Sequence, residues 1–149
     1  MSPDPLISVV IPSYNARDTL SRCLRMVFDQ DLEARFEVVV VDSSNEGTDE
    51  ILRQEFPWAL LLRLERRTSA GEARNLGAAK VAAPFVAFTD ADCMVARDRL
   101  RRMLRRHREA DYAAVGGSIA NGTPPGVWLA QRSTSLRSMS FSHTPPSGW

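Results

Sequence analysis

The chain has 149 residues, enough for one domain with its own hydrophobic core. Apolar residues make up 44% and charged residues 25%, the balance of a soluble globular protein, and a net charge of +1 gives no global field that would recruit nucleic acid or a membrane surface. The two cysteines, Cys23 and Cys93, are too few for a disulfide framework and lack zinc-ligand spacing, so we expect a reducing, cytoplasmic compartment.

Strand and helix signals alternate in the first half of the chain. Residues 6–11 form a short β-branched apolar run that ends at Pro12, which is typical of a strand buried on both faces. Apolar side chains then recur at helical spacing over about residues 16–30, which predicts an amphipathic helix. Residues 36–41 are a second buried strand, and after a run of turn residues a short helix follows over about residues 48–56.

The second half of the chain continues the alternation. Residues 59–64 have the composition of a third strand, and a Ser-x-x-Glu capping pattern opens a helix over about residues 69–81. Residues 84–89 are a fourth strand, and an apolar stripe over residues 100–107 predicts a helix whose outer face carries a cluster of arginines. Residues 112–115 predict a fifth strand.

Short connections between alternating strands and helices predict an α/β fold with a mainly parallel, doubly wound sheet and helices on both faces. After Ile119 the chain becomes rich in Pro, Ser and Arg, with one further helix signal over residues 127–137. We therefore expect one folded domain over residues 1–119 and a peripheral segment over residues 120–149. The longest apolar runs are too short to cross a bilayer, so we expect no transmembrane segment.

Polar side chains stand at the carboxyl ends of three predicted strands, where open parallel sheets bind ligands. The three segments are Pro12-Ser13-Tyr14-Asn15, Asp42-Ser43-Ser44 and Asp90-Ala91-Asp92. In a tight turn Asp90 and Asp92 can face one cation while Ala91 turns away, and such hard oxygen donors favour Mg²⁺ or Mn²⁺. Each Asp taken singly is equally compatible with a helix cap or a turn residue. Because Mg²⁺ and Mn²⁺ prefer oxygen donors, the neighbouring thiol of Cys93 is disfavoured as a ligand.

Four motifs in this order resemble those of family 2 glycosyltransferases with the GT-A (Rossmann-like) fold. Ile-Ser-Val-Val-Ile-Pro-Ser-Tyr-Asn at residues 7–15 is similar to the opening strand and loop of that family, and Val-Val-Val-Asp-Ser-Ser at residues 39–44 to its second nucleotide-contacting segment. Gly-Glu-Ala-Arg-Asn-Leu-Gly at residues 71–77 resembles its Ala-Arg-Asn-x-Gly helix start, and Val-Ala-Phe-Thr-Asp-Ala-Asp at residues 86–92 its Asp-x-Asp strand end.

The resemblance implies that residues 1–119 bind a nucleotide-sugar donor and that residues 120–149 are part of an acceptor region. The implied donor-binding residues are Pro12, Tyr14, Asn15, Asp42, Ser43, Arg74, Asp90 and Ala91. Tyr14 would lie beside the base, Asp42 would accept a hydrogen bond from it, and Arg74 would reach the base or the diphosphate. Asp92, together with Asp90, would hold Mg²⁺ or Mn²⁺ against the diphosphate.

The catalytic base that this family uses is an Asp or Glu well downstream of the Asp-x-Asp segment, and it takes the proton of the acceptor hydroxyl. Here no carboxylate follows Asp111, so the catalytic residue stays unknown. We expect a chain truncated on its C-terminal side, without the acceptor half and with weak or no transferase activity in isolation.

The expected function is metal-assisted, inverting transfer of a sugar from a nucleotide-diphosphate sugar to an acceptor hydroxyl. The acceptor stays open between a lipid-linked sugar, a polysaccharide and a small molecule, and the expected location is the cytoplasm, including the inner membrane face. A non-catalytic nucleotide-sugar-binding module is the alternative. A haloacid-dehalogenase phosphatase also places Asp-x-Asp at a strand end, but Met94 stands where that class has Thr or Val. A dinucleotide-binding Rossmann enzyme is disfavoured because no Gly-x-Gly-x-x-Gly follows the first strand.

Overall fold

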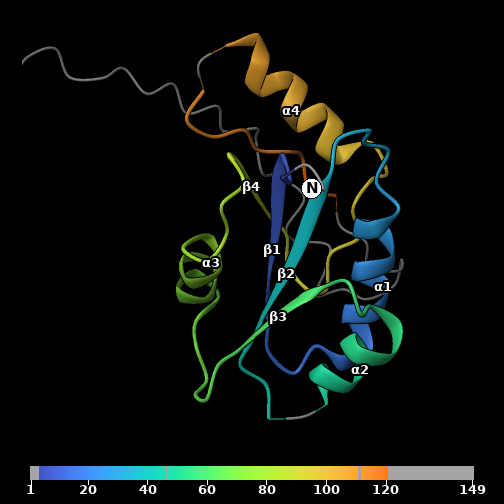
Figure 1. Ribbon diagram of the computed structural model, residues 1–149, viewed down its shortest axis with the longest axis vertical. Helices are drawn as coiled ribbons and strands as arrows, with labels where there is room; N and C mark the ends of the chain where they lie inside the picture. The colour runs from blue at the N-terminus through green and yellow to red at the C-terminus, as the bar shows by residue number, and fades with distance from the viewer. Residues whose placement is uncertain (1–3, 46, 111, 121–149) are drawn as a thin grey trace, which may run out of the picture. The chain divides into compact units, whose positions relative to one another are not determined.

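The computed structural model describes residues 4–45, 47–110 and 112–120. The chain divides into two compact units, Met1–Arg97 and Asp98–Trp149, and each is described by itself. The first unit alternates strands and helices along the chain (Figure 1). Its elements are β1 (Ile7–Ser13), α1 (Arg17–Phe28), β2 (Phe36–Asp42), α2 (Thr48–Glu55), β3 (Leu60–Arg63), α3 (Ala70–Ala78) and β4 (Phe85–Phe88).

The four strands form one parallel sheet in the order β3-β2-β1-β4. In its register Val10 of β1 lies between Val39 of β2 and Phe88 of β4. The chain moves outward from β1 through β2 to β3, and α3 then carries it back to β4 on the other side of β1. The direction of winding therefore reverses between β1 and β4, which is where doubly wound sheets bind ligands. The predicted α/β class and the parallel, doubly wound sheet are confirmed.

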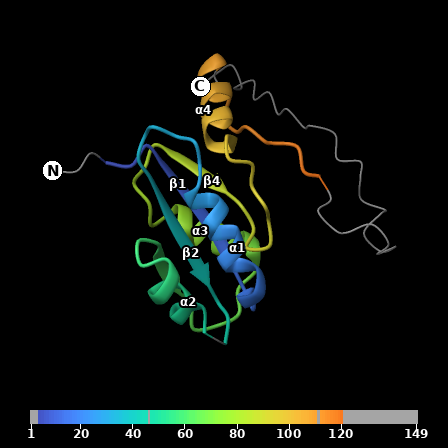
Figure 2. The ribbon, with the colours of Figure 1, turned by 90° about the vertical axis from the view of Figure 1, so that its right-hand side faces the viewer.

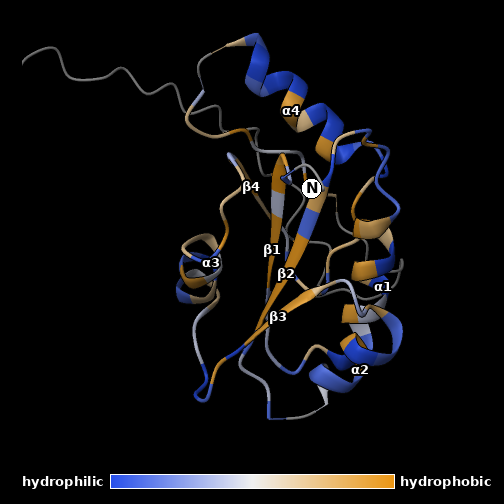
Figure 3. Ribbon diagram, in the orientation of Figure 1, coloured by the Kyte–Doolittle hydropathy of each residue, from blue (hydrophilic) through white to orange (hydrophobic). Residues whose placement is uncertain are grey.

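Helices cover both faces of this sheet, because alternate residues of β1 and β2 point to opposite faces and both sets are apolar. On one face Val10, Val39 and Val41 pack with Ala73 of α3. On the other face lie α1 and α2, and the two views agree on this layering (Figures 1 and 2). The strands are accordingly the most apolar part of the unit (Figure 3).

The two helices on the shared face are joined by an aromatic cluster and by a polar contact. The ring of Phe28 lies 6.0 Å from that of Phe56 and 5.7 Å from that of Trp58. Nearby, Arg25 of α1 donates a 2.7 Å hydrogen bond to Glu55 of α2, and this contact lowers the pKa of the Glu55 carboxyl. The contact is exposed to solvent, so the apolar cluster is the main link between α1 and α2.

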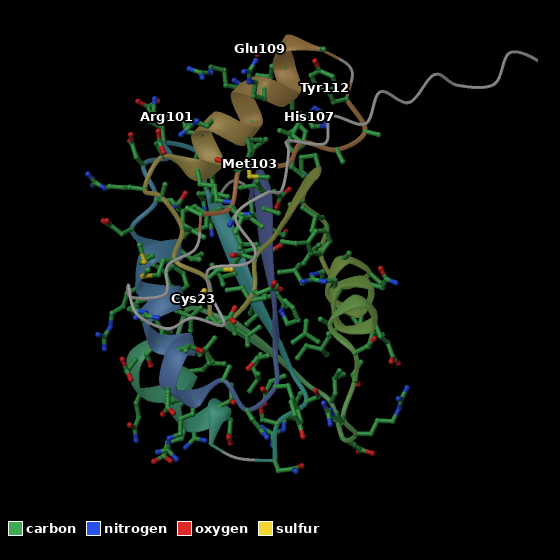
Figure 4. All side chains as sticks on the ribbon, turned by 180° about the vertical axis from the view of Figure 1, so that it is seen from behind. Cys23, Arg101, Met103, His107, Glu109 and Tyr112 are labelled. Atoms are coloured by element: carbon green, nitrogen blue, oxygen red, sulfur yellow. The ribbon has the colours of Figure 1, made fainter. Side chains whose placement is uncertain are left out.

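The second unit contains α4 (Arg99–Glu109), which confirms the predicted amphipathic helix. Leu100 and Leu104 are buried and His107 is half-buried on the same stripe, whereas Arg101 is exposed (Figure 4). The predicted fifth strand is wrong, because residues 112–120 contain no strand. That run is only Tyr-Ala-Ala-Val, and alanine buries too little apolar area to hold a strand in place. The helix predicted over residues 127–137 lies outside the described residues.

None of the helices in the described part of the chain combines the length and hydrophobicity that crossing a bilayer requires.

The approach of α3 to the sheet leads to a prediction about Gly77. A Cβ atom at this position would collide with a methyl carbon of Val10 and lie 2.9 Å from Cγ2 of Val41. Because a packed core cannot give way freely, we expect Gly77→Ala to lower the free energy of unfolding by about 1–3 kcal/mol in urea denaturation.

Gly71→Ala is the matched control, because a Cβ atom there would meet nothing within 4 Å. In the same helix alanine is the better helix former, so this change should be neutral or stabilising by about 0.5–1 kcal/mol. Equal losses of stability in the two variants would contradict the close packing of α3 on β1 and β2.

Candidate functional site

A cleft of about 360 Å³ opens at the carboxyl ends of β1 and β4, at the point where the winding of the sheet reverses. All three polar strand ends identified in the sequence contribute to its wall. Of the predicted donor-site residues, those that line it are Pro12, Tyr14, Asn15, Ser43, Asp90, Ala91 and Asp92. Asp42 and Arg74 are not part of the wall. Thr19 and Thr68 also line the cleft, although neither is among the donor-site residues predicted from the sequence.

The end of β4 turns sharply and presents two carboxylates. The backbone N–H of Cys93 donates a 3.0 Å hydrogen bond to the carbonyl oxygen of Asp90, which closes a turn over Ala91 and Asp92. Ala91 is buried beneath this turn, while the side chains of Asp90 and Asp92 are exposed. The thiol of Cys23, which is buried on α1, donates a 3.4 Å hydrogen bond to the same carbonyl oxygen (Figure 4). The turn is therefore anchored both by its own backbone and by α1.

The donor atoms on this turn suit a divalent cation. One oxygen each from Asp90 and Asp92 and the Sγ atom of Cys93 all lie within 4.8 Å of one another. The Asp92 carboxylate has no hydrogen-bond or ion-pair partner among the described residues, so its oxygens are available to a ligand. Two exposed carboxylates in an open site are the donors that Mg²⁺ and Mn²⁺ prefer. The thiol of Cys93, disfavoured as a ligand from the sequence, nevertheless belongs to the same group of atoms.

Asp42 occupies a different environment from the one expected. Its side chain is fully buried, with 0% exposed surface. Its two carboxylate oxygens are already engaged, because Ser44 Oγ donates to Oδ1 at 2.6 Å and Arg63 Nη1 donates to Oδ2 at 3.0 Å. Arg63 also donates from Nη2 to the backbone carbonyl of Ser44 at 2.8 Å. The structure therefore places Asp42 beneath the cleft and gives its neighbour Ser43 the position on the wall.

This buried network also fixes the loop that follows β1. The backbone N–H of Asn15 donates to Ser44 Oγ at 2.7 Å, and the N–H of Ser43 donates to the carbonyl of Ser13 at 3.0 Å. Asn15 has a positive φ of 50°, a left-handed conformation that asparagine tolerates better than most residues. The loop carrying Tyr14 is thus hydrogen-bonded to the end of β2. The hydroxyl of Ser13, the last residue of β1, is buried and has no hydrogen-bond partner among the described residues.

Two arginines approach the cleft from the side of α3. Arg74 forms an ion pair with Asp90. The guanidinium carbon of Arg67 lies 4.5 Å from the centroid of the Tyr14 ring, a cation–π contact. Arg67 is not among the residues predicted from the sequence, because the prediction rests on the polar ends of three strands only. Applied to β3 as well, the strand-end rule would have identified the loop at residues 64–69, which follows that strand.

The fold and the cleft define a class of protein: a doubly wound α/β domain that offers an open carboxylate pair at its topological switch point. The family is set by comparison with known sequences. The chain belongs to the family described as glycosyl transferase family 2, whose model matches residues 8–145. The predicted resemblance is therefore confirmed.

Individual relatives agree with this assignment. The glycosyltransferase AglE of Haloferax volcanii is 34% identical over 142 residues, which are 91% of this chain and 46% of AglE. Among solved structures, the mannosyltransferase PcManGT of Pyrobaculum calidifontis in complex with GDP-Man and Mn²⁺ is 28% identical, with a TM-score of 0.71 over 80% of this chain and 37% of that one. S. aureus TarS 1-349 in complex with UDP is 26% identical, with a TM-score of 0.65 over 79% and 38%. The chain spans less than half the length of each of these proteins.

The buried network leads to a prediction about Ser44. In Ser44→Ala the N–H of Asn15 and Oδ1 of Asp42 each lose a partner inside the protein. We expect the free energy of unfolding to fall by about 1–3 kcal/mol in urea denaturation, the cost of leaving buried polar groups unpaired.

Ser21→Ala is the matched control, because the hydroxyl of Ser21 makes a 3.2 Å hydrogen bond to Glu55 in an exposed position. A surface change of this kind should alter stability by no more than about 0.5 kcal/mol. If Ser44→Ala were as mild as Ser21→Ala, the network would not be what holds the two strand ends together.

Proposed function

We propose that this chain is the donor-binding part of a glycosyltransferase that moves a sugar from a nucleotide-diphosphate sugar to an acceptor hydroxyl. The observation that carries the proposal is the pair of exposed carboxylates, Asp90 and Asp92, on the wall of an open cleft at the switch point of the sheet. Membership of glycosyl transferase family 2 supports it, as do the nucleotide ligands of the similar solved structures.

In this proposal Asp92, with Asp90, holds Mg²⁺ or Mn²⁺. The metal would act as a Lewis acid that offsets the negative charge growing on the departing diphosphate. Arg74 holds the Asp90 carboxylate through their ion pair, which leaves the unpartnered Asp92 as the main metal ligand. A direct contact between Arg74 and the base or diphosphate, which the family resemblance implies, would require Arg74 to leave Asp90.

The nucleoside would occupy the part of the cleft formed by the end of β1 and by Ser43. Tyr14 supplies a half-exposed aromatic ring beside the base, and Pro12 and Asn15 supply the wall around it. Asp42 contributes indirectly, because Ser44 links its carboxylate to the loop that carries Tyr14. A direct hydrogen bond from the base to Asp42 would require the buried pair with Arg63 to open.

The transfer step itself needs a base that takes the proton of the acceptor hydroxyl, and we assign that role to no residue of this chain. We further propose that the transfer inverts the anomeric carbon and takes place in the cytoplasm. The acceptor would be a lipid-linked sugar, a polysaccharide or a small molecule. A non-catalytic nucleotide-sugar-binding module is the second candidate, because the open carboxylate pair at the cleft would serve binding of a nucleotide sugar equally well. Product formation with a panel of sugar donors and acceptors distinguishes the two.

The metal-dependent step of binding leads to a prediction about Asp92. We expect the wild-type chain to bind UDP or GDP in the presence of Mn²⁺, and Asp92→Asn to weaken this binding at least about tenfold, because a neutral amide is a poor ligand for a hard cation. Isothermal titration calorimetry with and without Mn²⁺ measures both.

Asp29→Asn is the matched control. It removes the same charge from an exposed residue at the C-terminal end of α1, where Asp29 pairs with Arg97, whereas the N-terminal end of α1 lies at the cleft. Its nucleotide affinity should equal that of the wild type. Absence of any Mn²⁺-dependent binding to the wild-type chain, or identical affinities for wild type and Asp92→Asn, would contradict the proposed function.

A further inference from the structure

Four arginines lie between the last residue of β3 and the end of α3, and only three of them form an ion pair with a carboxylate of the described residues. Arg63 is bonded to the buried Asp42 at 3.0 Å, and Arg66 forms a 2.7 Å ion pair with Glu72. Arg74 is paired with Asp90. Arg67 has no carboxylate partner within residues 4–45, 47–110 and 112–120, and its guanidinium lies over the Tyr14 ring.

Arg67 lies next to two residues of the cleft wall. Its guanidinium carbon lies 4.5 Å from the centroid of the Tyr14 ring, and Tyr14 lines the cleft. The next residue, Thr68, also lines the cleft, and its backbone N–H donates a 3.4 Å hydrogen bond to Ser43 Oγ. A guanidinium that rests with its face toward an aromatic ring keeps the N–H groups along its edge free to donate.

An arginine without an ion-pair partner can bind an anionic ligand at lower energetic cost than a paired one. Asp90 is already neutralised by Arg74, so recruiting Arg74 to a phosphate would first break an ion pair. Recruiting Arg67 breaks none. Arginine is also the side chain whose planar set of N–H donors matches the oxygens of a phosphate.

We propose that Arg67, held over the ring of Tyr14, binds the phosphates of the donor and supplies a fixed positive charge beside the cleft. This inference rests on the proposed function and extends it to a residue outside the family motifs quoted above. Tyr14 then has two roles, because it lines the cleft and its ring also holds the Arg67 guanidinium in place before the ligand binds.

The test compares Arg67→Ala with Arg66→Ala, its matched control. Both variants remove one exposed arginine from the same loop, so any effect of net charge is the same in both. In calorimetric titrations with UDP or GDP and Mn²⁺, we expect Arg67→Ala to weaken binding about 5- to 20-fold, the low end for a charge-assisted hydrogen bond because the site is exposed to solvent. Arg66→Ala should change the affinity less than about twofold.

Two further measurements separate a phosphate contact from a structural role. Binding to the wild type and to Arg66→Ala should weaken as the salt concentration rises, and this dependence should be smaller in Arg67→Ala, because an ionic contact has been removed. Arg67→Lys, which keeps the charge, should retain the salt dependence and recover part of the affinity. The urea midpoint of Arg67→Ala should match that of the wild type.

Equal effects of Arg67→Ala and Arg66→Ala would overturn this inference, and so would a loss of affinity in Arg67→Ala with unchanged salt dependence. In either case the proposed function would stand, provided that the wild-type chain binds the nucleotide with Mn²⁺. A wild-type chain that fails to bind would overturn both.

Discussion

The buried carboxylate of Asp42 is the feature on which the geometry of the cleft depends. A charge with no exposed surface is tolerated only when hydrogen bonds and an opposite charge satisfy it, and Ser44 and Arg63 do so here. The same serine accepts the N–H of Asn15, so satisfying Asp42 also sets the left-handed bend that aims Tyr14 at the cleft. Local electrostatics at the end of β2 thus determines the shape of the loop after β1.

Of the four charged side chains on and beside the cleft wall, two are paired with one another and two are unpaired among the described residues. Asp90 and Arg74 neutralise one another, whereas Asp92 and Arg67 have no charged partner in the described part of the chain. One unpaired carboxylate and one unpaired guanidinium at the same cleft suit a ligand that brings both a cation and an anion. A divalent metal bound to a diphosphate has this character, and a neutral sugar alone does not. The pattern of pairing therefore supports the proposed donor class independently of the family motifs.

The sequence predicts the parts of this structure that depend on local patterns. The apolar runs of β1 and β2 become strands because both faces of each are buried, and the capping pattern at Ser69 is confirmed by its 3.2 Å hydrogen bond from the N–H of Glu72. Which side chain of Asp42-Ser43-Ser44 lines the cleft could not be read from the sequence. It depends on Arg63, a residue of β3, which forms an ion pair with Asp42 and keeps that carboxylate away from the cleft. The contact of Arg67 with Tyr14 is likewise between loops far apart in the chain. The short run at residues 112–115 forms no strand, because its two alanines bury too little apolar area to hold it against a neighbouring strand.

The residues that form the proposed donor site all lie between β1 and the turn after β4, within the first compact unit. The arginine-rich helix α4 belongs to the second unit and is partly neutralised by its own acidic residues, since Arg106 bonds Glu109 at 2.9 Å and Arg102 lies 3.9 Å from Asp98. Its positive charge is therefore not needed for the proposed binding of phosphates, which Arg67 and a metal on Asp92 would account for. In the proposed function, donor binding and sugar transfer are therefore separable. Donor binding would require only groups that lie around the cleft, whereas sugar transfer would also require a base and an acceptor surface.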